Sequence, residues 1–201
     1  TPETPVFHKR RALYGFPHAL EPIRRSGRVV VCEGYFDRVA LDRAGLGEGL
    51  ATCGTALSSD HGKAIRRRTR EVVLLFDGDR AGQKAMERAL ETLLPEGLRV
   101  RAAALPPGDD PDSILLSRGP SALAQIVNEA PDAIETLMTN TLAEGSATPA
   151  QRSDVVGRVA PLIARVMDPV ERVEHARRLA VAVGTDFRAV EAVVRTALRR
   201  G

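Results

Sequence analysis

Two short runs of apolar, β-branched residues constrain the fold of this chain more than any other feature. They are Arg28–Cys32, with the sequence RVVVC, and Glu71–Phe76, with the sequence EVVLLF. Neither run alternates between apolar and polar residues, as a strand with one exposed face would. A continuous apolar run of this length is typical of a parallel strand that is buried on both faces. The two runs therefore predict strands in the interior of a parallel sheet that is covered by helices.

Segments with helical spacing separate these runs from each other and from two further predicted strands, near residues 49–53 and 98–105. Strands that alternate with helices four times favour an α/β fold with a mostly parallel sheet flanked by helices. The residues after about Pro120 have helical spacing, and Asp168 followed by Pro169 marks the expected start of one helix. We therefore predict an α/β domain followed by a small all-α helical subdomain.

The predicted organisation has three parts. Residues 1–27 form a basic, helical lead-in segment from a preceding N-terminal subdomain, interrupted at Gly15. Residues 28–119 form the catalytic α/β domain, and residues 120–201 form the helical subdomain. The segment 144–150, EGSATPA, has the composition of a linker.

Charge and aromatic content point to a modest affinity for polyanions. The 201 residues carry a formal net charge of +3 and have a pI of about 9.2. Six of the Lys and Arg residues, against two acids, lie within residues 1–30, which indicates local attraction for a polyanion. Aromatic residues make up only 3% of the chain. Base stacking is therefore not expected to be the main way in which this protein holds nucleic acid.

The two cysteines, Cys32 and Cys53, do not form a CxxC motif. We interpret them as inert buried thiols, and no zinc ribbon is predicted. No apolar run approaches the length of a membrane span, and no signal peptide is visible, so a cytoplasmic protein without membrane contacts is expected. Because the chain begins with TPETP and has no initial Met, we expect it to be part of a longer protein.

Acidic side chains follow three of the four predicted strands. Glu33 follows the first strand, Asp77 and Asp79 follow the third, and Asp110 and Asp112 follow the fourth after a short loop. Ligands of open parallel sheets bind outside the carboxyl ends of the strands, so these acids should converge on one edge. Carboxylates held close together raise one another's pKa, and a hard divalent cation such as Mg²⁺ removes that cost. The pattern predicts a divalent-metal site, with enough acids for two ions acting on a phosphate ester.

Glycines accompany these acids. Gly34 follows Glu33 directly, and Gly78 separates Asp77 from Asp79. Each glycine is predicted to let the backbone turn tightly without a Cβ atom.

Helix capping is the alternative interpretation of several acids. Asp37, Asp79 and Asp110 each stand where they can cap a following helix. Taken singly, each is more readily explained as a cap. Capping does not explain Glu33, however, and Asp112 exceeds what one cap requires. The complete set therefore favours a metal site.

Five blocks of sequence, in order, resemble those of bacterial DnaG-type primases, and the acids match the toprim pattern of that family. The match covers residues 1–112, whereas the helical remainder fits the family only by position and composition. The blocks are TPVFHK with LYG at residues 4–15, EGYFD at 33–37, ATCGTA at 51–56, FDGDRAG at 76–82 and DPD at 110–112.

The resemblance implies RNA primer synthesis on a single-stranded DNA template from ribonucleoside triphosphates, during bacterial DNA replication. It implies catalytic roles for Glu33, Asp77 and Asp79, with Glu33 acting either as a metal ligand or as general base on the primer 3′-hydroxyl. The implied cofactor is Mg²⁺ or Mn²⁺. Its implied ligands are Glu33, Asp77, Asp79, Asp110 and Asp112, with Asp37 assisting.

The resemblance also implies a surface for nucleic acid or nucleotide. Lys9 would line the template or nucleotide groove, and Tyr14 belongs to one of the matching blocks. Lys63 and the basic residues 66–68 can add phosphate contacts, although a solvated helix face explains that run equally well.

Two other functions remain as alternatives. A toprim-type nuclease or topoisomerase fragment would cleave phosphodiester bonds with the same acids, but a topoisomerase needs a nucleophilic tyrosine. Tyr14 and Tyr35 are the only tyrosines, and both belong to the primase-like blocks. A phosphatase-like enzyme, with Asp77 as nucleophile, or a non-catalytic α/β module leaves Glu33 unexplained.

The resemblance also indicates which parts of such a primase are missing. The family's zinc-binding domain and most of the basic N-terminal part of its polymerase core are not recognisable in the sequence. We also expect the region that contacts the replicative helicase to lie outside this chain. Metal binding should therefore be retained, whereas template binding by this chain alone is in doubt.

Overall fold

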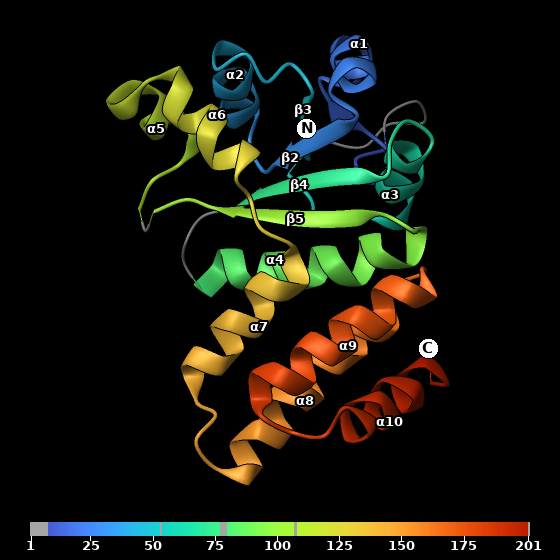
Figure 1. Ribbon diagram of the computed structural model, residues 1–201. Helices are drawn as coiled ribbons and strands as arrows, with labels where there is room; N and C mark the ends of the chain where they lie inside the picture. Colours follow the sequence, from blue (N-terminus) through green and yellow to red (C-terminus); the bar gives the residue numbers. More distant parts are fainter. Residues whose placement is uncertain (1–7, 53, 77–79, 107, 201) are drawn as a thin grey trace. The chain divides into compact units, whose positions relative to one another are not determined.

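The computed structural model describes residues 8–52, 54–76, 80–106 and 108–200 (Figure 1). The chain divides into two compact units, residues 1–131 and residues 132–201. We call them the sheet unit and the helical unit and describe each by itself. The division lies later than the expected boundary at 119/120.

The sheet unit is built on a five-stranded sheet with the order β1-β3-β2-β4-β5. Strands β2 to β5 are parallel, and the short edge strand β1 runs antiparallel to β3. This arrangement confirms the predicted mostly parallel sheet. The strands are β1 Leu13–Tyr14, β2 Arg28–Cys32, β3 Gly49–Thr52, β4 Glu71–Phe76 and β5 Arg99–Ala104.

The two apolar runs form neighbouring central strands, β2 and β4, and their bounds are those predicted from the sequence. Val29 and Val30, which point to opposite faces of the sheet, are both fully buried. One face, which includes Val30 and Val73, packs in a hydrophobic core with residues of α2, α5 and α6. In Figure 1, α4 lies along the other face. Helices therefore cover both faces, as continuous apolar strands require.

The segments with helical spacing between the predicted strands form helices in the sheet unit. Ser58 caps α3, and α3 ends at Arg66. The helices are α1 Phe16–Ser26, α2 Tyr35–Arg43, α3 Ser59–Arg66, α4 Arg80–Leu93, α5 Pro111–Arg118 and α6 Pro120–Asn128, and a single 3₁₀ turn, η1 Leu94–Glu96, follows α4.

Two boundaries differ from the predicted organisation for physical reasons. In the lead-in segment, Leu13 and Tyr14 pair with β3, so these residues are part of the sheet. Gly15, with φ of 85°, turns the chain into α1. At the other boundary, Leu123 and Val127 of α6 are fully buried in the core against the sheet. The residues that make α6 look like the start of a helical subdomain therefore anchor it to the sheet unit.

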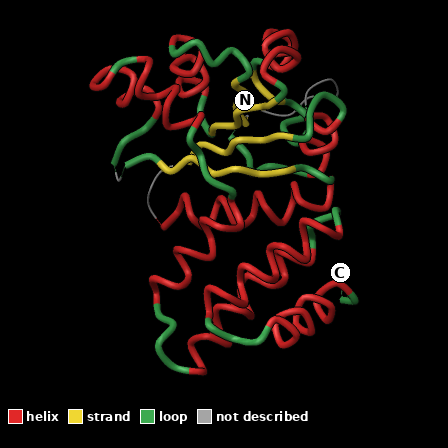
Figure 2. The backbone as a smooth tube through the Cα atoms, viewed as in Figure 1, coloured by secondary structure: helices red, strands yellow, loops and turns green. Residues whose placement is uncertain are grey.

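The helical unit contains α7 Ala133–Glu144, α8 Pro149–Ala164, α9 Pro169–Val183 and α10 Phe187–Leu198 (Figure 2). Asp168 caps α9 as predicted, since its Oδ1 accepts a hydrogen bond of 2.8 Å from the Val170 N–H. The expected linker, residues 144–150, contains a short loop between α7 and α8 of this same unit. The small residues there serve a helix–helix connection inside the unit.

No helix in the described parts of the chain is long and apolar enough to span a membrane.

Candidate functional site

The carboxyl ends of the parallel strands bring Glu33 and the segment before α5 to one edge of the sheet. Because β2, β4 and β5 are parallel neighbours, their carboxyl ends lie at the same edge, where ligands of such sheets bind. Glu33 follows β2 and is exposed. The Thr52 hydroxyl at the end of β3 donates a hydrogen bond of 3.5 Å to the Glu33 carbonyl oxygen. The carboxyl ends of β2 and β3 are thus tied together at Glu33.

Asp37 turns back onto the start of its own helix. Its Oδ2 accepts a hydrogen bond of 2.8 Å from the Gly34 N–H, and Gly34 is the residue before α2. Gly34 has φ of −105°, a conformation open to any residue, so the predicted tight turn is not the reason for this glycine. A Cβ atom on Gly34 would come within 2.9 Å of the Asp37 carboxylate. A side chain at position 34 would therefore push the Asp37 carboxylate out of its present position.

Asp110 and Asp112 lie at the start of α5, which follows β5. Asp110 is the N-cap, since its Oδ1 accepts a hydrogen bond of 2.7 Å from the Ser113 N–H. The capping interpretation of Asp110 is therefore confirmed, and it uses only one of the two carboxylate oxygens. Asp112 is half-buried in the first turn of the helix. No hydrogen bond joins its carboxylate to another described residue.

Asp77 and Asp79 lie outside the described residues. Within the described residues, no three His, Cys, Asp or Glu side chains lie close enough together to hold a metal ion. The predicted carboxylate cluster includes Asp77 and Asp79, so the metal site remains a prediction. Of its other members, Glu33 leaves the sheet at the same edge as the helix start that carries Asp110 and Asp112.

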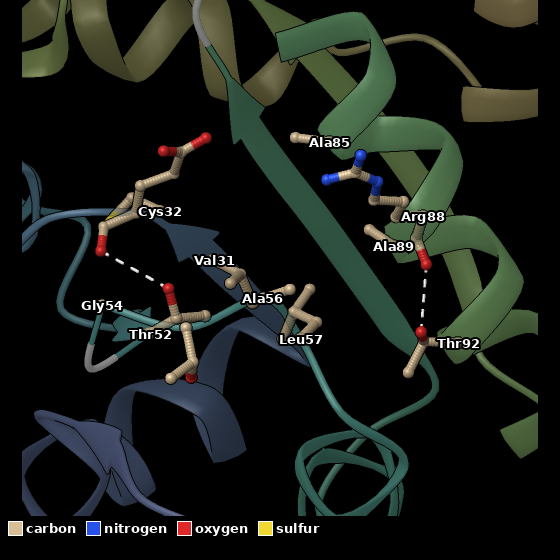
Figure 3. Close-up of a pocket in the computed structure, with 12 residues that line it drawn as sticks. Val31, Cys32, Thr52, Gly54, Ala56, Leu57, Ala85, Arg88, Ala89 and Thr92 are labelled. Atoms are coloured by element: carbon tan, nitrogen blue, oxygen red, sulfur yellow. Dashed lines mark hydrogen bonds between the residues drawn. The ribbon is translucent and has the colours of Figure 1, made fainter. Parts of the chain in front are cut away.

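A cavity of about 450 Å³ adjoins Glu33 on the sheet face that carries α4 (Figure 3). This volume falls in the range of small-molecule sites. The Thr55 hydroxyl oxygen in its wall is buried and has no hydrogen-bond partner among the described residues. Arg88, on α4, supplies an exposed guanidinium beside the cavity. The walls are Val31–Glu33, Thr52, Gly54–Leu57 and, on α4, Ala85, Arg88, Ala89 and Thr92.

Cys32 also lines this cavity, but its thiol stays protonated and unreactive. Burial raises the pKa of the Cys32 thiol far above its ordinary value. The thiol donates a hydrogen bond of 3.4 Å to the Leu50 carbonyl oxygen. Cys32 is thus an inert buried thiol, as the sequence indicates, whereas Cys53 lies outside the described residues.

The three predicted nucleic-acid residues lie on different elements. Lys9 is half-buried in a turn before β1, and Lys63 is exposed on α3. Tyr14, in β1, is 46% exposed. Its ring packs edge-to-face against Tyr35, the first residue of α2, with 4.8 Å between the ring centroids. The tyrosine pair joins the predicted lead-in segment to the residues that follow Glu33.

Sequence reasoning did not single out Arg88, Thr55 or His61. Arg88 resembles any exposed arginine on an amphipathic helix, and only the path of the loop 54–57 shows that it borders a cavity. Thr55 lies in the block at residues 51–56, so the resemblance contained a signal for it. His61 is fully buried, although its neighbours in sequence, Asp60 and Lys63, are exposed.

Comparison with known families finds two matches along the chain. Residues 30–115 match the family described as Toprim-like. Residues 137–187 match the family described as the DnaB-helicase binding domain of primase. The second match overturns the expectation that such a region lies outside this chain. The helical spacing of these residues showed no motif by which the sequence alone would have identified them.

Curated relatives are similar over nearly the whole chain. The chain is 38% identical over 189 residues to the DNA primase of Pseudomonas aeruginosa. The matched region covers 92% of this chain and 28% of the relative. The chain is 35% identical over 188 residues to the DNA primase of Escherichia coli. Here the matched region covers 92% of this chain and 32% of the relative. The chain therefore spans about a third or less of the length of these relatives.

Solved structures agree with these matches. A DNA primase domain from Pseudomonas aeruginosa superimposes with a TM-score of 0.85 at 34% identity, over 96% of this chain and 62% of that one. A DnaG primase catalytic domain bound to single-stranded DNA gives a TM-score of 0.80 at 34% identity, over 90% of this chain and 59% of that one. The sheet topology, the sequence blocks and both family matches lead to one conclusion: this chain belongs to the bacterial DnaG-type DNA primase family.

Proposed function

We propose that this chain carries the catalytic centre of a bacterial primase, which synthesises RNA primers on single-stranded DNA during replication. The observation that carries the proposal is the position of Glu33 at the carboxyl ends of the parallel strands, in a chain that matches primases over 92% of its length. Ligands of such sheets bind at that edge. An enzyme of DNA replication in a bacterium would work in the cytoplasm.

The donor set suits Mg²⁺ or Mn²⁺. The proposed ligands are all carboxylates, the oxygen donors that hard divalent cations prefer. Glu33 is exposed, and the cap formed by Asp110 leaves one of its carboxylate oxygens available. When bound, the ions would balance the negative charge that develops on the phosphate oxygens, and two ions would suit this reaction. The proposed set is Glu33, Asp77, Asp79, Asp110 and Asp112, with Asp37 assisting.

The proposed reaction is a nucleotidyl transfer. The oxygen of the primer 3′-hydroxyl attacks the α-phosphorus of a ribonucleoside triphosphate and forms a new P–O bond. The bond from that phosphorus to the bridging oxygen breaks, and pyrophosphate leaves. Glu33 either accepts the hydroxyl proton as general base or holds a metal ion. A positioned base of this kind typically contributes a factor of about 10² to 10⁴ to the rate.

The cavity beside Glu33 is the proposed place for the triphosphate. Its volume of about 450 Å³ is large enough for part of a nucleotide. Arg88 offers a planar guanidinium to phosphate oxygens. The buried Thr55 hydroxyl, which has no partner among the described residues, offers a further hydrogen bond. Both groups lie in the walls that Glu33 shares.

Single-stranded nucleic acid is proposed to contact Lys9, Tyr14 and Lys63. A lysine supplies a point charge to a phosphate, and an exposed tyrosine ring supplies a face on which a base stacks. Tyr14 is held in place by its edge-to-face contact with Tyr35, so little freedom would be lost when a base binds.

The helical unit is proposed to contribute to binding of the replicative helicase. The support is the match of residues 137–187 to the DnaB-helicase binding family. Those residues lie within α7, α8, α9 and the start of α10.

One assay separates this function from its alternatives. The full-length protein is incubated with single-stranded DNA, ribonucleoside triphosphates and Mn²⁺, with and without a chelator. Primers that form only with the metal support the proposal, whereas cut DNA indicates a nuclease. The Asp77→Ala variant is expected to abolish ribonucleotide incorporation. Unchanged synthesis in that variant would contradict the proposal.

A further inference from the structure

The turn that carries Lys9 is held against the first turn of α3. Its backbone closes on itself, since the Arg11 N–H donates to the His8 carbonyl oxygen at 2.9 Å. His61 lies beneath it and is fully buried. The Nε2 atom of His61 lies 3.0 Å from the Lys9 carbonyl oxygen, and the Ser58 N–H lies 3.3 Å from Nδ1. One imidazole therefore contacts both α3 and the turn.

These two contacts assign the proton on the ring. The Ser58 N–H can only donate, so Nδ1 must accept and carries no proton. The Lys9 carbonyl oxygen can only accept, so Nε2 must carry the proton and donate it. Burial lowers the pKa of the imidazole, which favours this neutral form. Both ring nitrogens are thus satisfied, as a buried polar side chain requires.

Two neighbouring residues hold the same turn. The Ser58 hydroxyl donates a hydrogen bond of 2.5 Å to the Arg10 carbonyl oxygen and accepts one of 3.2 Å from the His61 N–H. Arg11 forms an ion pair of 3.3 Å with Asp60, but both side chains are exposed, so it contributes little. The backbone contacts through Ser58 and His61 therefore define the position of the turn.

The sheet connects this turn to Glu33. β1 is antiparallel to β3, and Leu13 pairs with Thr52, the last residue of β3. The residues before Leu13 therefore continue in the direction of the carboxyl end of β3. Thr52 is also the residue whose hydroxyl donates to the Glu33 carbonyl oxygen. The turn thus leads into a strand that begins beside the proposed catalytic edge.

We propose that His61 is a positioning residue, which holds the backbone of the Lys9 turn so that Lys9 meets a phosphate of single-stranded nucleic acid in one fixed place. The inference rests on the proposed nucleic-acid role of Lys9 and adds the residue through which that role is maintained. A preorganised lysine loses less conformational freedom when it binds.

A purely structural role for His61 makes a different prediction. In that case the important contact is the one within α3, in which Nδ1 accepts from the Ser58 N–H. Two substitutions separate the two contacts. His61→Gln places an amide near the position of Nε2 and can still donate to the Lys9 carbonyl oxygen. His61→Asn places an amide near Nδ1, so it can still accept from Ser58 but does not reach Lys9.

The test measures binding of a fluorescent single-stranded oligonucleotide to the full-length protein, at several salt concentrations. Lys9→Ala should lower affinity up to roughly fivefold and reduce the salt slope by about 0.7, the value for one phosphate contact on a single strand. His61→Asn should reproduce both effects, and His61→Gln should bind like the wild type. The opposite order of the two variants would overturn the proposal.

A double variant tests whether His61 acts through Lys9. With Lys9→Ala already present, His61→Asn should produce no further loss of affinity. Additive losses would overturn the proposal, as would an unchanged affinity in Lys9→Ala. Metal-dependent primer synthesis by the wild-type protein is measured separately. Its absence would reject the proposed reaction, while the comparison of the binding variants would still decide the role of His61.

Discussion

The sheet unit and the helical unit differ in what they bury. Among the described residues, the sheet unit buries four polar or charged side chains: Arg38, Glu48, Thr52 and His61. The helical unit buries one, Thr141, whose hydroxyl donates only to the Leu137 carbonyl oxygen of its own helix. A buried polar group is costly unless it finds a partner. In the sheet unit, Glu48, Thr52 and His61 contact residues far away in sequence, whereas Arg38 pairs with Asp42 of its own helix.

The partners of these groups show where specificity is needed. Thr52 reaches Glu33, and His61 reaches Lys9, across 19 and 52 residues of sequence. Arg28 pairs with the buried Glu48 at 2.9 Å, between the start of β2 and the residue before β3. The helical unit packs mainly through aliphatic side chains. Chemistry requires particular atoms in particular places, whereas a helical bundle requires only an apolar stripe of the right period.

The largest expected effect tests the catalytic edge of the sheet unit. Glu33→Gln keeps the shape of the side chain and removes its charge, so primer synthesis by the full-length protein should fall by about 10² to 10⁴-fold. Glu71→Gln is the matched control, because Glu71 begins β4 at the opposite end of the sheet. It should prime normally. Equal activity of the two variants would remove Glu33 from the reaction.

A substitution that creates a cavity tests the aliphatic packing of the helical unit. Ile163 of α8 is fully buried, so Ile163→Ala should lower the free energy of unfolding by about 2 to 5 kcal/mol. Urea denaturation followed by circular dichroism measures this loss. Leu74→Ala, at a fully buried position in β4, should give a loss in the same range. A change below about 1 kcal/mol for Ile163→Ala would show that the helical unit is loosely packed.

A smaller effect is expected from the cap of α9. Asp168 accepts hydrogen bonds from the Val170 and Glu171 N–H groups at 2.8 and 3.0 Å. Asp168→Ala should lower the free energy of unfolding by about 1 kcal/mol. Asp154→Ala removes an exposed acid from the interior of α8 and should have almost no effect. Similar losses of unfolding free energy in the two variants would show that Asp168 acts through its charge and not through capping.

The smallest expected effect is a pH dependence specific to the sheet unit. Burial holds the pKa of His61 below its ordinary value of 6.5. The unfolded chain therefore binds a proton at a pH where the folded chain does not. Stability should be complete above about pH 6.5 and should decline as the pH falls through the lower, folded pKa.

His61→Gln removes the titrating group and provides the comparison. Urea unfolding at pH 7.5, 6 and 5 should show a steeper loss of stability in the wild type than in this variant. Parallel curves would mean that His61 has the same proton affinity in the folded and the unfolded chain. The helical unit contains no fully buried histidine among its described residues, so this difference should come from the sheet unit.

Local signals determined most of the elements. The apolar runs predicted β2 and β4 at their observed bounds, and the pairs Asp110–Pro111 and Asp168–Pro169 marked the starts of α5 and α9. These signals are readable because a strand buried on both faces must be apolar throughout, and because a cap acts within three residues of its helix. The ordered sequence blocks likewise identified the family.

Contacts between distant residues were decided only by the tertiary structure. The pairing of β1 with β3, the approach of His61 to Lys9 and the cavity wall formed by Arg88 join segments that are far apart in sequence. The membership of α6 in the sheet unit depends on Leu123 and Val127 reaching the sheet core. Hydrophobic periodicity shows that a helix has a buried face but not which partner covers it. For that physical reason, the strands and the candidate acids could be identified from the sequence. The contacts that hold the Lys9 turn became visible only in the tertiary structure.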